Sequence, residues 1–531
     1  MTARLHKLAA RLREERGFTM VVVMGVLLVA TAFSVAALAA ADNDDPQSRH
    51  DQDSKRAYAA AEAGIANYVF HIENDPSFWA QCSTPVTTPP LPTPTGLNPA
   101  WIGSGPDPRT SWRNVPSSSA QWAVELLPAN GASQCDKNNP DATMIDTTTG
   151  TFSIRSTGRS SSAANAVKRS IVATFRRRSF LDYVWFTDYE DMDPAISGDS
   201  VSGCTKYFRD GRSGCTEIQF RGGDGISGPF HTNDQFLVCN SPTFGRQNQT
   251  PPDKIESSDP NLYRVAGGCS NSPVFYGTQT PSAALLSLPP SNISLGSLAS
   301  GIYKPTGQTD IILNGNQVCI RAHVTPVNTN PASCTAAQWH TFPPNGVIYV
   351  QNGTCGVAYN LTSPYTVPSG CGEAWVSGNY AGNLTIGADK DVVIDGDLTA
   401  TGTNLLGLIA NNYVRIYHPV TGVSGTGTGA SCTNATGTMT NVNVNAAILS
   451  LNHSFLVDYY MCGAQLGTLH IKGAIAQKFR GPVGQSGGSP SGYTKDYQYD
   501  DQLGYREPPS FLDPVQTSWK ILRYTEQLPP R

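Results

Sequence analysis

Residues 16–41 read RGFTMVVVMGVLLVATAFSVAALAAA and join a basic leader to twenty-four uncharged residues, Phe18 to Ala41. At about 1.5 Å per helical residue, this segment reaches roughly 36 Å, which exceeds a hydrocarbon core of about 30 Å. The leader, residues 1–17, holds five basic and two acidic residues, so the positive-inside rule keeps it on the cytoplasmic side. We therefore expect a membrane-spanning helix directly after the leader.

Two other interpretations of this segment stay open. A secretory signal has an apolar region of about 7–15 residues that ends at a small-x-small site, and Ala37-Leu38-Ala39 offers such a site. A plain uncleaved anchor also fits the length. The apolar run is longer than a secretory signal needs, which favours a retained helix.

The junction Arg16-Gly17-Phe18-Thr19, followed by a long apolar helix, resembles the class III signal of type IV pilins and pseudopilins. The resemblance implies cleavage between Gly17 and Phe18 by a prepilin peptidase, N-methylation of Phe18, and packing of the retained helix in a filament core. Most members carry a glutamate five residues after the cut, where this chain has Val22. Minor, tip-located members of the family lack that glutamate.

A second stretch, Ala60-Ala61-Glu62-Ala63-Gly64, is similar to the N-terminal region of PilX-type minor pilins. Around it, an apolar residue recurs at helical spacing and predicts one apolar stripe, made of Tyr58, Ala61, Ile65, Tyr68 or Val69, and Ile72. The segment between the two apolar parts is charged and contains Pro46, which we expect to kink or interrupt the helix.

Composition limits the classes of protein that fit. The chain has 531 residues with 15% charged residues, 50 glycines and 38 prolines, so it is too long for one ordinary domain and too apolar for disorder. Its formal net charge is −4, and removing the basic leader makes it more negative. That balance disfavours broad nonspecific binding to nucleic acid, which needs a basic surface.

The twelve cysteines all follow the apolar segment, which indicates an oxidising compartment. Their spacing fits neither a CxxC motif nor a zinc site, and we predict no metal, no cofactor and no catalytic thiol. Neighbours that close short loops are the expected bridges, although sequence alone leaves the connectivity open. The expected pairs are Cys204 with Cys215, Cys319 with Cys334, Cys355 with Cys371, Cys82 with Cys135, Cys239 with Cys269, and Cys432 with Cys462.

The remaining pattern predicts two β-rich parts. Residues 121–127, 151–155 and 166–175 alternate apolar with polar, as half-buried antiparallel strands do, so the N-terminal part is expected to be α+β. Further on, short aliphatic strands separated by Gly or Asn turns predict an all-β module, an irregular parallel β-solenoid with a β-sandwich as the alternative. The expected domains are a leader (1–17), a transmembrane or filament helix (18–75), a pilin-like β head (76–190), the solenoid-like module (195–485) and an extended C-terminal tail (486–531).

Two groups of carboxylates are candidates for a calcium site and for a catalytic site. Asp188, Glu190, Asp191 and Asp193 offer oxygen ligands for calcium but lack the spacing of an EF-hand loop, which favours a solvated acidic turn. Asp391, Asp395 and Asp397 alternate along one predicted strand, and paired carboxylates are what glycoside hydrolysis requires. The His and Arg/Lys arrangement of polygalacturonases is missing beside them, so we expect a structural role.

The sequence thus favours a nonenzymatic minor subunit of a type IV pilus or related filament, acting at the tip or in priming. The resemblance implies other pilins, the prepilin peptidase and the inner-membrane assembly platform as partners, and a surface glycan, a cell or DNA as candidate ligands. It also implies a single-pass location in the cytoplasmic membrane before assembly and the cell surface afterwards. The alternative is a membrane-anchored surface β-helix enzyme that acts on polysaccharide.

Overall fold

The computed structural model describes residues 16–74, 78, 112–132, 135–136, 140–146, 151–355, 368–425, 430–485, 490–504, 506–515 and 519–530, and within the long helix the side chains of residues 23–34 and 48–72. The chain divides into two compact units. The first comprises residues 1–145, 152–175 and 521–531, and the second comprises residues 146–151 and 176–520.

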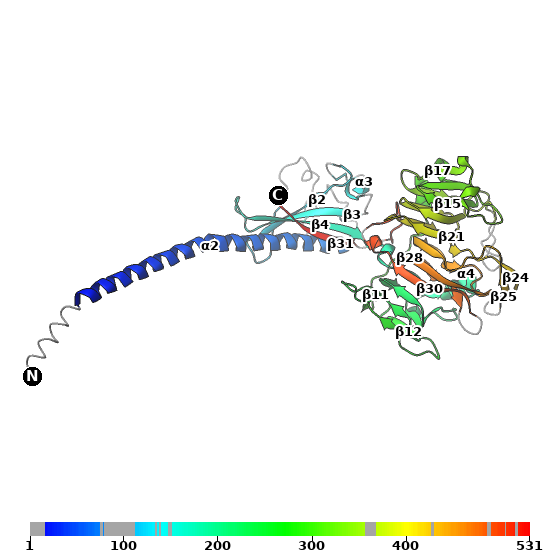
Figure 1. Cartoon of the computed structure of the whole chain (residues 1–531), viewed down its shortest axis with the longest axis horizontal. Coiled ribbons are helices and arrows are strands. Elements are labelled where there is room, and N and C mark those ends of the chain that lie inside the picture. Colours follow the sequence, from blue (N-terminus) through cyan, green and yellow to red (C-terminus); the bar gives the residue numbers. More distant parts are fainter. Residues whose placement is uncertain are drawn as a thin grey trace, which may run out of the picture. The chain divides into compact units, whose positions relative to one another are not determined.

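The first unit combines one long helix with a five-stranded sheet (Figure 1). Helix α2 (Arg16–Asn74) runs without a break, so the expectation that Pro46 interrupts it is wrong. A proline removes one backbone donor, and the flanking hydrogen bonds continue the helix on both sides. The sheet has the order β1 (Arg113–Asn114), β2 (Gln121–Leu127), β3 (Thr151–Arg159), β4 (Lys168–Arg177) and β31 (Trp519–Gln527), and a short helix, α3, spans Pro140–Met144. The β1–β2 and β2–β3 pairs are antiparallel.

Two glycines bring α2 close to the sheet. A Cβ atom built on Gly158 of β3 would lie 2.0 Å from the carbonyl oxygen of Ala57, and one built on Gly64 would lie 2.2 Å from the Oγ atom of Ser156. Of the predicted stripe, Ala61, Ile65, Tyr68 and Ile72 are buried, together with Ala57 and Ala60, whereas Tyr58 is 38% exposed, so its inclusion is wrong. Tyr68 packs against Phe152 and Phe175, whose rings stack at 4.9 Å. The small residues thus let the helix backbone meet the sheet directly.

The second unit is almost entirely β, and most of its strand pairs are parallel (Figure 1). A first ladder of parallel pairs contains β18 (Val347–Val350), β20 (Leu384–Ala388), β22 (Leu406–Ala410), β26 (Asn443–Ser450), β28 (Gln465–Arg480), β5 (Trp185–Met192), β8 (Phe230–Thr232), β11 (Lys254–Ser257) and β14 (Thr278–Thr280). A second contains β15 (Thr309–Gly315), β19 (Ala374–Tyr380), β21 (Val392–Ala400), β23 (Val414–Ile416) and β27 (Phe455–Val457).

A third ladder uses other residues of β26 and β28 from the first ladder and of β19 and β21 from the second. It joins β19, β21, β26 and β28 to β30 (Ser491–Tyr499), β7 (Gly225–Ser227), β10 (Thr243–Phe244) and β13 (Val274–Phe275). A separate parallel sheet has the order β12 (Tyr263–Val265), β9 (Phe236–Cys239) and β6 (Gln219–Arg221). The other β-strands and α-helices described in this unit are β16 (Gln317–Ala322), β17 (Trp339–Thr341), β24 (Val420–Ser424), β25 (Ser431–Asn434), β29 (Gly484–Gln485), α4 (Pro194–Ser197), α5 (Val201–Cys204) and α6 (Ile293–Leu298).

The stacking order of the ladders does not follow the sequence. Trp185 of β5 pairs with Ile475 of β28, and Ile226 of β7 pairs with Tyr497 of β30. Strands β5 and β7, from the beginning of this unit, therefore stack on β28 and β30, which come from its end. All four of these side chains are buried in one apolar core.

The domain boundaries accordingly differ from the predicted ones. Strand β5 begins at Trp185, inside the predicted head, yet it belongs to the sheet of the second unit. The predicted tail, residues 486–531, contains β30, a ladder strand, and β31, which pairs beside β4 in the five-stranded sheet. The strands that pair with these segments lie far away in the sequence, so neighbouring residues alone do not assign them to a sheet.

Candidate functional site

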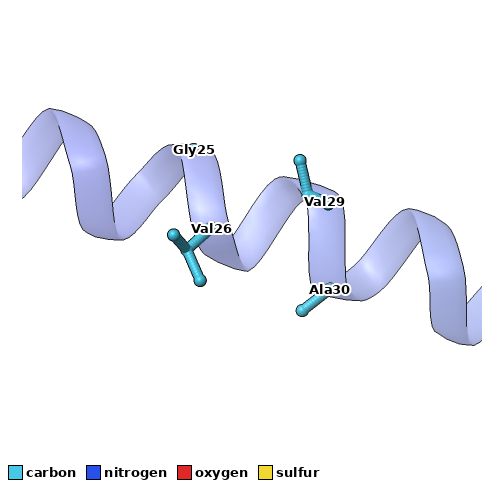
Figure 2. A pocket seen from close by; sticks show the side chains of 4 residues that line it. All are labelled: Gly25, Val26, Val29 and Ala30. Atoms are coloured by element: carbon cyan, nitrogen blue, oxygen red, sulfur yellow. The ribbon is translucent and has the colours of Figure 1, made fainter.

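The N-terminal half of α2 carries an exposed apolar surface. Each large apolar side chain described there is more than half exposed, and Phe33 is 74% exposed. A shallow depression of about 420 Å³ is lined by Gly25, Val26, Val29 and Ala30, the residues labelled in Figure 2. Val26 and Ala30, one turn apart, project to the same side of the helix in Figure 2. The polar side chains in this stretch, Thr31 and Ser34, donate their hydroxyls to the backbone carbonyl oxygens of Leu27 and Ala30, so the surface suits an apolar partner. The exposed set is Val23, Met24, Val26, Leu27, Leu28, Val29 and Phe33.

The residues that the pilin resemblance selects lie in or before this helix. Gly17, Phe18 and Val22 belong to the backbone of α2, and their side chains lie outside the described residues, as do leader residues 1–15. Glu62 is exposed on the half of α2 that packs against the sheet. Among the described residues, which include the side chains of only 23–34 from the predicted span, no helix has the length and apolar character needed to cross a membrane.

The cysteines form disulfides in the second unit. The structure contains Cys204–Cys215, Cys239–Cys269, Cys319–Cys334, Cys355–Cys371 and Cys432–Cys462, and these pairings agree with those expected from neighbouring positions. Cys135 is also disulfide-bonded, and Cys82, its predicted partner, lies outside the described residues. Each of the five bridges closes a loop of 11 to 30 residues within the second unit.

The expectation of a solvated acidic turn at Asp188–Asp193 is wrong. Glu190, Asp191 and Asp193 are buried, and Glu190 and Asp191 lie on β5. Arg480 contacts Glu190 at 3.2 Å, and the Nδ1 atom of His453 lies 2.8 Å from Asp193. Asp188 accepts hydrogen bonds from Tyr207 and Asn233 at 2.9 Å and 2.8 Å. Arg480 and His453 lie far along the chain, so the acidic run by itself does not reveal that Glu190 and Asp193 are paired.

Asp191 differs from its neighbours. Among the residues that the structure describes, neither of its carboxylate oxygens has a hydrogen-bond donor. Arg212 lies 3.9 Å from it, and burial raises its pKa to about 8. The sulfur atoms of Cys204 and Cys215 lie within 4.8 Å of it, the one such grouping of potential metal ligands among the described residues. Because these sulfurs are joined in a disulfide, they are not the thiolates that a metal would bind.

The aspartates weighed as a catalytic pair occupy three different environments. Asp391 accepts a 2.9 Å hydrogen bond from buried Arg415, which also binds Asp458 at 2.8 Å. Asp395 is buried, and burial reinforced by the carboxylate of Asp310 raises its pKa to about 7. Asp397 is exposed and accepts a backbone hydrogen bond from Asn443 at 2.9 Å. The ion pair ties Asp391 to the core, as expected for a structural role.

Comparison with known proteins gives little. No protein-family profile and no curated protein matches this chain. One solved structure to which it is similar is the competence-associated pilin ComZ from Thermus thermophilus, with a TM-score of 0.27 and 12% sequence identity over 90% of this chain and 97% of that chain. A likeness at this TM-score carries no argument about the present chain.

Proposed function

We propose that this chain is a minor subunit of a type IV pilus or a related filament, held in the cytoplasmic membrane by α2 before assembly. The observation that carries the proposal is the division of α2 into an exposed apolar half and a half that packs against its own sheet. A helix of this kind anchors its head while leaving its first half to lipid or to neighbouring helices. The signal at Arg16–Thr19 supplies the independent support.

Processing follows from the same assignment. The prepilin peptidase would cut between Gly17 and Phe18 and methylate Phe18, and the helix would then pass to other pilins through the inner-membrane assembly platform. After assembly, the protein would be located at the cell surface. The ion pair between Asp391 and Arg415 favours a nonenzymatic head. The ladders of parallel pairs support our further proposal that the second unit is an irregular parallel β-solenoid.

The processing step is tested by the mass of the protein extracted from membranes. We predict that mature protein begins at methylated Phe18, and that Gly17→Val leaves the precursor uncut because the bulky side chain blocks the peptidase. Gly25→Ala is the matched control, since a Cβ there meets nothing within 4 Å, and it should be processed normally. Wild-type protein that starts at Met1, or close to Ala40, would refute the assignment.

Val22 bears on the position in the filament. In the family, the glutamate at this place pairs with the N-terminal amine of a neighbouring subunit, and a charged amine in an apolar core without a partner is costly. A subunit with Val22 would stack poorly on itself, so we predict a tip or sparse position. Immunogold labelling of sheared filaments should give rare or terminal particles, and dense decoration along the length would contradict this.

A further inference from the structure

Polar side chains form two rows across consecutive strands of the third ladder in the second unit. Asn445, Lys472 and Gln498 pair in register on β26, β28 and β30, and two residues earlier Asn443, His470 and Asp496 do the same. The residues between the two rows, among them Ile471 and Tyr497, are buried, so the rows lie on the outer face.

The first row extends beyond these three strands. Gln498 pairs with Ser227 of β7 on one side. On the other side, β21 joins β26 where Leu398 pairs with Val444, and Asn314, Asn379 and Thr399 pair in register on β15, β19 and β21. Adjacent strands lie about 4.8 Å apart, so the outer face repeats an amide or hydroxyl group at that interval.

Residues of both rows line a cleft of about 260 Å³. In its second row, the Nδ1 atom of His470 lies 2.8 Å from Asp496, and Gln498 donates to the same carboxylate at 3.2 Å. The side chains of Asn445 and Lys472, in contrast, have no hydrogen-bond partner within the part of the chain that the structure describes. The cleft therefore combines groups that are already paired with an amide and an ammonium that are available to a ligand.

The chemistry of the lining indicates the class of ligand. Amide side chains both donate and accept hydrogen bonds, as a sugar hydroxyl does. One ammonium, from Lys472, is balanced by one carboxylate, from Asp496, so a polyanion such as DNA or an acidic glycan would gain little. We propose that this face binds an extended chain of uncharged sugars, with Asn445 and Lys472 hydrogen-bonding its hydroxyls in the cleft.

The proposal goes beyond a filament role and does not depend on it, because every residue used lies in the second unit. Its test uses the full chain in a sugar-free detergent and isothermal titration with maltohexaose, cellohexaose and the hexamer of N-acetylglucosamine. Hexagalacturonate and single-stranded DNA are the charged probes. We expect at least one neutral chain to bind and both charged probes to bind more weakly or not at all.

The double variant Asn445→Ala/Lys472→Ala should weaken that binding about tenfold, as expected for two lost hydrogen bonds. Lys254→Ala is the matched control, since Lys254 is an exposed lysine on β11, outside the cleft, and it should bind like wild type. Equal unfolding midpoints would show that both variants fold. Failure of all three neutral chains, preference for a charged probe, or unchanged binding by the double variant would each overturn the proposal, without bearing on cleavage at Gly17.

Discussion

Replacing Gly158 by alanine should separate α2 from the sheet of the first unit. The new Cβ would lie 2.0 Å from the carbonyl oxygen of Ala57 and 2.4 Å from the backbone nitrogen of Ala61. Both are helix backbone atoms, so no change of rotamer relieves the clash. The helix must move away by about 1 Å, and a gap of that size loses a quarter to a half of the dispersion energy of each contact.

The size of the effect follows from what that movement loosens. Ala57, Ala60, Ala61 and Ile65 are almost completely buried between α2 and the sheet. Overpacking of a core costs about 1–3 kcal/mol, and a clash between two backbones belongs at the upper end of that range. We therefore expect the local free energy of opening to fall by about 3 kcal/mol.

Hydrogen exchange of peptides from residues 57–68 is the suitable assay, because it reports local opening in a chain of two units. A loss of about 3 kcal/mol accelerates exchange by about a hundredfold. Gly64→Ala is the comparison, since its nearest neighbour is the side-chain oxygen of Ser156 and alanine favours the helix by about 1 kcal/mol. It should cost much less. Wild-type exchange in Gly158→Ala would refute the reasoning.

Two further predictions concern the second unit. Arg415→Met leaves Asp391 and Asp458 buried without their cation, so the free energy of unfolding should fall by about 3–5 kcal/mol in denaturant titrations, and a loss below about 1 kcal/mol would contradict this. Stability should also decrease between about pH 5 and about pH 8. The folded-state pKa of Asp395 is raised from 3.8 to about 7 and that of Asp458 to about 6, so the stability they contribute is fully present below their unfolded pKa and lost as the pH rises through these values. Asp191, whose pKa burial raises to about 8, adds to this loss. Burial lowers the pKa of His71 and His418 from 6.5, so their contribution rises with pH and offsets part of it. Glu256, whose pKa is lowered from 4.5 to about 2, acts in the opposite sense below that range. A denaturation midpoint that rises from about pH 5 to about pH 8 would exclude this account.

Local patterns predicted several elements well. Strand β2 has the bounds expected from its alternation, Gln121 to Leu127, and β3 begins at Thr151 as expected. Ala61, Ile65 and Ile72 of the stripe on α2 are buried as their helical spacing indicates, although Tyr58 is exposed. In each case the signal and the structure involve residues within one element, so neighbouring positions contain the information.

The acidic run shows where such reasoning ends. The run Asp188, Glu190, Asp191 and Asp193 has the composition of a solvated turn, because a carboxylate is rarely buried unless it is paired. The two residues that pair with Glu190 and Asp193, Arg480 and His453, lie more than 250 residues away in the sequence. Neighbouring residues in the sequence do not indicate these partners. The cleft that Asn445 and Lys472 line is not predictable for the same reason, because its two rows form only when β26, β28 and β30 pair in register.

The sequence by itself predicted the long helix, the strands at residues 121–127, 151–155 and 166–175, and five disulfides between neighbouring cysteines, because each depends on residues close together in the chain. The cleavage junction after Gly17 stays a prediction. Only the tertiary structure decided which strands stack on which. It placed β30 on β7, β5 on β28 and β31 beside β4, although the paired segments are separated by hundreds of residues. The physical reason is that the alternation of apolar residues along a segment predicts a strand but does not specify its neighbours. Which strands pair depends on the side chains that meet across the ladder in the folded core.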